Sequence, residues 1–205
     1  MRKLLAFLSA ATLAGAGITS CSDASGTGGV TIDTLLGVDL LTGVVLSDGT
    51  ADVNGTPFAG DSDAQEPGLN IRAFFTFDLT SLPAGAVLRT AFLRIYQWDV
   101  VNSPYSTLGD LVVDHLVYGN TLDAADYDVA EISRGFGVLS TDSTIETKQV
   151  SVLQQVQADL DAGRTVSQFR VRFAILSDND GLPDFADFWG PTELPAPIIR
   201  VAYDP

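Results

Sequence analysis

Residues 71–79 read IRAFFTFDL and residues 87–100 read VLRTAFLRIYQWDV, and these two stretches decide the fold class. The first stretch is rich in phenylalanine, which favours a strand. The second stretch has a period of two, and Ala91, Leu93 and Ile95 fall on one side of an extended chain. The opposite side then carries Phe92, Arg94, Tyr96 and Trp98. Both stretches therefore predict β-strands, and the second has one apolar side.

The rest of the chain repeats this alternation of short strands and turns. Further strands are expected at residues 110–118, 145–150, 167–176 and 198–203. Residues 120–144 are irregular and acidic, and residues 151–163 have the apolar spacing of a helix that stops at Gly163. The pattern predicts an all-β fold: a jelly-roll β-sandwich of two antiparallel sheets with one short α-helix near 151–163.

The composition excludes several classes of function. The chain has 205 residues and a formal net charge of −15, so its overall field does not favour nucleic acid phosphates. A single cysteine excludes an internal disulfide framework, and a single histidine excludes sites that need several histidine ligands.

The N-terminus predicts export and a lipid anchor. Residues 1–20 combine a charged start with an apolar stretch of about 15 residues, which is short for a membrane span and typical of a signal peptide. Ile18-Thr19-Ser20-Cys21 resembles a bacterial lipobox, and the resemblance implies that Cys21 is lipidated, becomes the new N-terminus and is acylated. An ordinary secretory signal with a cysteine at the cleavage point is the alternative.

The predicted anchor also sets the domain organisation and the compartment. Residues 21–31 read as a flexible tether after the lipidated cysteine, and residues 32–205 as a single β-sandwich domain. Ser22 follows the cysteine, which by the sorting rule of such lipoproteins implies the outer membrane of a bacterial envelope. The membrane is then one partner of this protein, through its lipid anchor.

The central strands also carry a family resemblance. Residues 72–87, RAFFTFDLTSLPAGAV, resemble the central signature of DNRLRE-type domains, in which a strand ending Phe-Asp-Leu is followed by a Leu-Pro turn with glycine. Residues 90–96 and 197–203 are similar to the strand that follows and to the closing strand of that family. The resemblance implies a jelly-roll domain. Some members of the family are carbohydrate-binding modules attached to polysaccharide lyases, and others are surface or structural domains.

A candidate ligand face follows from the strand alternation. The residues expected to point away from the core are Arg72, Phe74, Arg94, Tyr96, Trp98, Arg170 and Arg172. Aromatic rings stack on sugar C–H faces, and arginine forks grip carboxylates at two points, so this face is a candidate surface for an anionic polysaccharide. In the alternative, the arginines pair with Asp and Glu across strands, and the aromatic residues lie under the 101–109 or 120–144 loops.

Acidic clusters offer candidate metal ligands. Asp178, Asp180 and Asp184 resemble part of an oxygen-rich Ca²⁺ loop, although the full loop with its terminal glutamate is absent. A β-turn with solvated carboxylates is the alternative. A second group, Asp48, Asp52, Asp61 and Asp63, has the same two interpretations.

No catalytic motif accompanies these candidates. His115 shares the expected inward side of its strand with Leu111 and Val113, and no nucleophile motif occurs in the chain, so His115 is interpreted as a core or edge residue. The sequence predicts a lipid-anchored, non-catalytic protein of the cell envelope that binds an anionic polysaccharide. The alternative is a structural or protein-interaction lipoprotein of an envelope assembly, without a glycan ligand.

Overall fold

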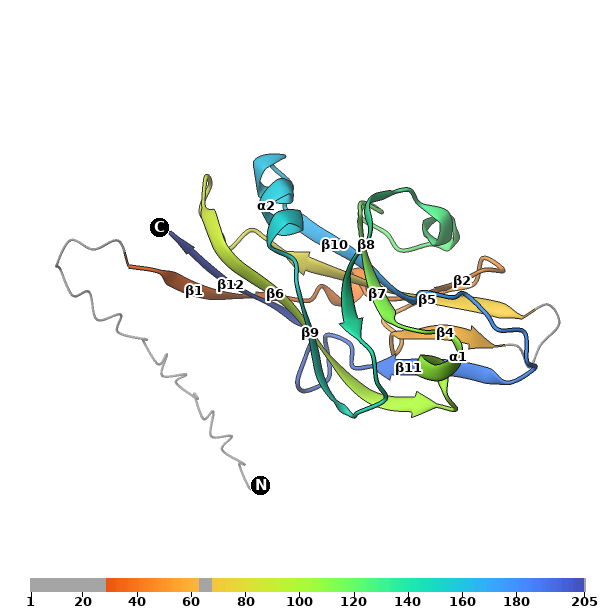
Figure 1. The fold of residues 1–205 in the computed structure, drawn as a ribbon. Coiled ribbons are helices and arrows are strands. Elements are labelled where there is room, and N and C mark those ends of the chain that lie inside the picture. The colour runs from red at the N-terminus through yellow and green to blue at the C-terminus, as the bar shows by residue number, and fades with distance from the viewer. Residues whose placement is uncertain (1–28, 63–67, 205) are drawn as a thin grey trace, which may run out of the picture.

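A computed structural model describes residues 29–62 and 68–204 (Figure 1). The predicted signal peptide, Cys21 and most of the tether lie outside the described residues. The described strands are β1 (Thr31–Leu36), β2 (Gly43–Leu46), β3 (Ala51–Val53), β4 (Phe58–Ser62), β5 (Leu69–Asp78), β6 (Val87–Val101), β7 (Leu111–Leu116), β8 (Glu131–Ser140), β9 (Glu146–Ser151), β10 (Val166–Phe173), β11 (Pro183–Phe188) and β12 (Ile198–Asp204). The helices are α1 (Pro104–Thr107) and α2 (Leu153–Asp161), with 3₁₀ turns at Asp39–Leu41 and Ala124–Asp128.

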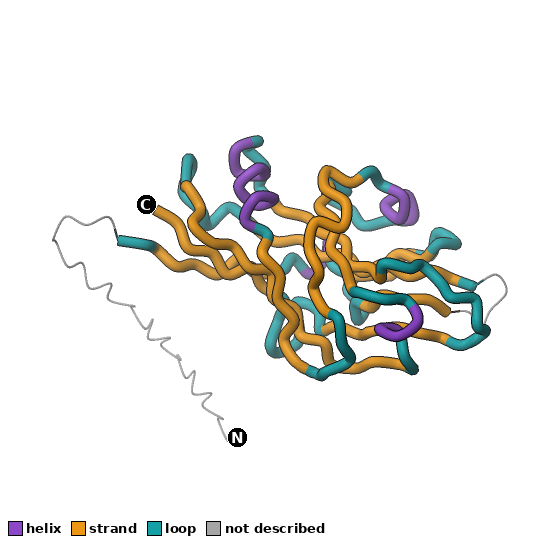
Figure 2. The backbone as a smooth tube through the Cα atoms, viewed as in Figure 1, coloured by secondary structure: helices purple, strands orange, loops and turns teal. Residues whose placement is uncertain are grey.

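The described residues form mostly strands (Figure 2), and the pairs between these strands are antiparallel, which confirms the prediction of a mostly β, antiparallel fold. Hydrogen bonds connect the strands in one path, β1-β12-β6-β11-β4-β5-β10-β7-β8, with β2, β3 and β9 attached beside it. The path forms one open sheet because β11 pairs with β6 on one side and with β4 on the other. No described helix is long and apolar enough to cross a membrane.

The main core forms between strands that are distant along this path. Leu93 of β6 and Ile199 of β12 belong to the same buried cluster as Phe75 of β5 and Phe169 of β10. The alternation predicted for β6 is confirmed, since Ala91, Leu93 and Ile95 are fully buried. Each large apolar side chain buried in this way contributes about 1.5–3 kcal/mol, so this cluster is the main stabilising feature of the domain.

The 120–144 segment is more regular than predicted. It contains a 3₁₀ turn and the strand β8, which pairs with β7. The strand was missed because the register shifts several times along this pair and because Gly135 has a φ of +53°. These features break the period of two on which the sequence analysis depended.

The predicted helix is confirmed, and a buried polar group holds it in place. Asp159 of α2 is fully enclosed and accepts hydrogen bonds from Ser167 Oγ at 2.5 Å and from Arg164 Nη1 at 2.6 Å. His115 Nε2 lies 3.0 Å from the same carboxylate, and His115 is buried as the sequence predicted. Buried polar groups need such partners, so this network fixes the helix against β7 and β10.

Candidate functional site

The seven residues predicted to share one ligand face lie in two different environments. Arg72 and Phe74 of β5, with Arg170 and Arg172 of β10, are buried. Arg94 and Tyr96 of β6 are half-buried, and Trp98 is 39% exposed. The structure therefore does not bring all seven together on one open surface. We call the first group the covered arginine cluster.

Asp114 of β7 is the centre of the covered arginine cluster. One of its oxygens, Oδ2, accepts hydrogen bonds from Arg170 Nε at 3.0 Å, Arg170 Nη2 at 2.8 Å and Arg172 Nε at 2.9 Å. The other, Oδ1, accepts from the backbone N–H of Gly135 at 2.7 Å. Burial alone would raise the pKa of Asp114, but the hydrogen bonds from Arg172 and Gly135 outweigh it and the pKa lies below its usual value.

Residues 117–131 complete the cover over this cluster. Arg72 lies 3.7 Å above the ring of Tyr127 and donates to the backbone carbonyl of that residue. Phe74 packs edge-on against Tyr118 at 5.4 Å. The alternative described above holds for the arginines of this cluster, since Arg72, Arg170 and Arg172 each form an ion pair with an aspartate. Phe74 is likewise covered, here by Tyr118.

A different surface is open on the strands at the other end of the sheet. In Figure 1, β1, β12 and β6 lie side by side near the C-terminus, and β9 pairs with the other side of β6. Their cross-strand partners place one set of side chains on the side opposite the core. This set, which we call the open face, is Ile32, Thr34, Leu36, Thr90, Phe92, Arg94, Tyr96, Thr147, Gln149, Ser151, Ile198, Arg200, Ala202 and Asp204.

Among the described residues of the open face the one carboxylate is Asp204, which lies at the end of β12 and is ion-paired with Arg89 at 2.7 Å. The open face is hollowed by a groove of about 440 Å³, whose lining includes Ile32, Phe92, Arg94, Gln149, Arg200 and Ala202. A smaller hollow of about 90 Å³ adjoins it, because Arg94 also lines that space together with Tyr96. The open face therefore offers a concave surface with two cations and aromatic rings.

The two arginines of the open face lack carboxylate partners. Within the described residues, neither Arg94 nor Arg200 forms an ion pair, and the buried Arg94 Nε has no hydrogen-bond acceptor. A buried donor is normally satisfied, and leaving one unpaired costs about 1–3 kcal/mol. The groove thus presents a guanidinium that needs an acceptor.

Aromatic side chains extend the open face along β6. Tyr96 and Trp189 have ring centroids 4.4 Å apart at an interplanar angle of 31°, and Trp189 donates its backbone N–H to the carbonyl of Tyr96 at 3.1 Å. The sequence analysis missed Trp189 and Arg200. Alternation within residues 198–203 was a usable signal for Arg200, whereas Trp189 follows β11, which was interpreted as an acidic loop.

Two carboxylates oppose each other where β6 continues past Trp98. Asp99 and Asp187 are cross-strand partners on β6 and β11. Burial and the neighbouring charge of Asp99 raise the pKa of Asp187 to about 6. This part of β6 is therefore acidic, unlike the part that carries Arg94.

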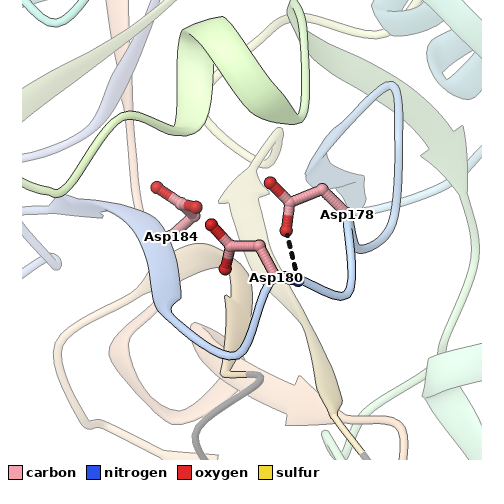
Figure 3. A group of neighbouring side chains, drawn as sticks. All are labelled: Asp178, Asp180 and Asp184. Atoms are coloured by element: carbon pink, nitrogen blue, oxygen red, sulfur yellow. Dashed lines mark hydrogen bonds between the residues drawn. The ribbon is translucent and has the colours of Figure 1, made fainter.

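The structure brings together the three predicted metal ligands, Asp178, Asp180 and Asp184. Their carboxylates point toward one another, and ligand oxygens from all three lie within 4.8 Å of each other (Figure 3). Asp184 is buried and also accepts the backbone N–H of Ser103 at 2.7 Å. This acidic triad could hold a metal ion, since hard cations take several oxygen ligands.

The second predicted acidic cluster does not form such a group among the described residues. Asp48 accepts the backbone N–H of Thr50 in the turn between β2 and β3. Asp61 of β4 instead accepts the backbone N–H of Asp184 at 3.1 Å, next to the triad. Asp63 lies outside the described residues.

No protein-family model matches the sequence, and no curated protein matches it. The similarity to DNRLRE-type domains therefore stays a prediction from the residues quoted for it.

Proposed function

We propose that this protein is a lipid-anchored, non-catalytic component of a bacterial envelope whose β domain binds an anionic polysaccharide on the open face. The observation that carries the proposal is the groove of the open face, whose lining contains Arg94 and Arg200 and no carboxylate, on a chain of net charge −15. In such an acidic chain, an acid-free groove with unpaired arginines favours a negatively charged ligand.

The aromatic residues of β6 are the reason for proposing a saccharide as the ligand. Phe92 and Tyr96 lie in the same row of β6 as Arg94, and Trp98 is exposed beyond them. Aromatic rings present flat apolar surfaces that suit the C–H faces of sugar rings, and arginine supplies the charged contact.

The anchor and the compartment rest on the N-terminal sequence. A lipidated and acylated Cys21 at an outer membrane would hold the domain close to that surface, because the tether of residues 21–31 is short. Replacement of Cys21 by serine is expected to abolish labelling by radioactive palmitate and to release the protein from membranes.

We further propose the jelly-roll sandwich as the finer description of the fold. Support comes from the main core, in which Leu93 and Ile199 meet Phe75 and Phe169 across the interior. Strands so far apart along the hydrogen-bonded path share one core only if the sheet folds over itself.

A structural or protein-interaction lipoprotein is the second candidate function. It is favoured by β1, which ends the strand path and exposes Ile32 to 62% and Leu36 to 63%. Exposed apolar residues on an edge strand are typical of surfaces that pair with another chain.

Calcium is the metal we propose for the acidic triad. Ca²⁺ takes 6–8 oxygen ligands in flexible geometry, and a group of three carboxylates suits it better than a metal that requires nitrogen or sulfur. If the ion is bound, the melting temperature rises with added Ca²⁺ and falls with a chelator, and Asp180→Asn abolishes that difference. A melting temperature that is unchanged by both additions would remove this part of the proposal.

A polysaccharide array tests the main proposal. The intact protein is expected to be retained by one or more anionic polymers, and Trp98→Ala is expected to weaken retention about tenfold. Trp98 lies on β6, a strand of the open face, whereas the matched control Ile132→Ala changes an exposed apolar residue of β8, which does not belong to that face. If no polymer retains the intact protein, the second candidate function is favoured instead.

A further inference from the structure

We infer that Arg94 and Arg200 together form a receptor for a single carboxylate group, so that the polymer bound by the open face is a carboxylated saccharide with well-spaced charges. This inference rests on the proposed function and narrows it from anionic polymers in general to one chemical class. The receptor lies in the groove between β12, β6 and β9.

The strand register brings the two arginines to the same groove. Arg200 of β12 is the cross-strand partner of Phe92, and Arg94 is two residues further along β6 on the same side. Such diagonal neighbours have backbones roughly 7–8 Å apart, which is within reach of two long side chains. Gln149 of β9 is the partner of Arg94 on the other side and adds an amide donor beside it.

The state of these arginines differs from that of most arginines in the molecule. Arg72, Arg89, Arg164, Arg170 and Arg172 each form an ion pair with a carboxylate of this chain. Among the described residues Arg94 and Arg200 have no such partner, and Arg94 Nε is buried without an acceptor. A planar arginine fork matches the two coplanar oxygens of a carboxylate, which would satisfy the donor that the fold leaves unpaired.

The surroundings of the two arginines favour a polymer with widely spaced negative charges over a polymer with a dense row of them. Beyond the two arginines, the groove is lined by uncharged residues such as Thr90, Phe92 and Ala202. Further along β6, Asp99 and Asp187 would repel a second anion. A heavily sulfated chain would place its additional charges against this uncharged and then acidic surface, whereas a chain with spaced carboxylates would not.

Small probes test the receptor without knowledge of the natural polymer. The full-length chain in detergent is labelled with ¹⁵N, and the Nε–H resonance of Arg94 is assigned by its loss in Arg94→Lys. Sodium glucuronate is expected to shift this resonance in a saturable manner. Methyl glucoside should not shift it, and glucose 6-sulfate should require at least tenfold higher concentrations.

Arginine-to-lysine variants then separate the effect of the positive charge from that of the planar guanidinium group. Arg94→Lys and Arg200→Lys keep the positive charge but lose the planar fork, so each should weaken glucuronate binding about tenfold, measured on other groove resonances such as the Gln149 side-chain amide. Arg134→Lys is the matched control on β8, and it should bind glucuronate as the parent does. Circular dichroism melting shows whether each variant remains folded.

The outcomes distinguish this inference from the proposed function. Equal shifts with glucuronate and glucose 6-sulfate, or full binding by both lysine variants, would overturn the carboxylate receptor. The same holds if none of the probes shifts Arg94. In each of these cases, retention of the intact protein by a polysaccharide on the array would leave the proposed function standing, and absence of retention would remove that function separately.

Discussion

The covered arginine cluster and the open face arise from the same kind of sequence but differ in what lies over them. In β10 and in β6, arginine alternates with apolar residues, and in both strands the apolar residues point into the main core. The arginines of β10 are enclosed by Asp114, Glu131 and the 117–131 segment. Those of β6 and β12 border a groove.

Arginine therefore has two roles in this molecule: it stabilises the fold in the covered arginine cluster, and we propose that it binds a ligand on the open face. An enclosed arginine with a carboxylate partner stabilises the fold only while the pair is intact, because each charge alone would be costly to bury. An arginine without a partner at a groove adds no ion pair to the fold and remains able to bind a ligand. Substitutions on the two surfaces should therefore affect different properties.

The largest predicted effect is the loss of the Asp114 carboxylate. Asp114→Asn leaves Arg170 and Arg172 without their shared partner in a buried position, and the free energy of unfolding should fall by about 3–5 kcal/mol. For a domain of this size that corresponds to a decrease of roughly 10 °C in melting temperature, measured by circular dichroism.

Asp110→Asn is the control for this change, since Asp110 is an exposed aspartate close to the same strand. A stability of Asp114→Asn equal to that of the control would mean that the covered arginine cluster is solvated rather than structural. The comparison between the two surfaces would then fail.

Half of the twelve described strands could be predicted from local pattern alone. β6, β10 and β12 show alternation in their own residues, and α2 has helical spacing and a glycine stop. β4 and β11 lack this signal, because Gly60 has a φ of +148° in β4 and β11 begins with proline and carries two aspartates. Their strand structure depends on pairing with each other and with distant strands.

A second prediction compares one phenylalanine from each surface. Phe74 is fully buried against Tyr118, so Phe74→Ala should lower the free energy of unfolding by about 3–4 kcal/mol. Phe92 lies at the groove, and Phe92→Ala should lower it by at most about 1 kcal/mol while weakening retention on the polysaccharide array. Urea unfolding measures both values. If both variants lose stability equally, β6 is covered as β5 is.

The candidate site could be predicted only in part, because local pattern does not show which distant segments cover a side chain. Alternation gives the direction of a side chain relative to its own strand, and for Arg94 and Tyr96 this was sufficient to place them on a surface. Alternation does not show whether another segment of the chain covers the side chains that point away from the core. Arg170 meets Asp114 across 56 residues of sequence, and such a contact leaves no local pattern in either strand.

The smallest predicted effect concerns the acidic end of β6 and depends on pH. The pKa of Asp187 is raised to about 6 by burial and by Asp99. Because the folded protein holds the proton of Asp187 more tightly than the unfolded chain does, protonation favours the folded state. This contribution to the free energy of unfolding is complete below the pKa of the unfolded chain and is lost as the pH rises through 6. In Asp187→Asn this loss is absent. The variant should therefore match the parent near pH 4 and exceed it by about 1 kcal/mol at pH 7.5, after allowance for solvent screening.

Melting temperatures of the parent and of Asp187→Asn at the two pH values measure this difference, with Asp110→Asn as the exposed control. A constant difference at both pH values would show that Asp187 acts through packing and not through its charge. A difference confined to the higher pH would identify an uncompensated negative charge where β6 passes Trp98. Such a charge limits how far an anionic polymer extends along that strand, and anion binding should then strengthen as the pH falls below 6.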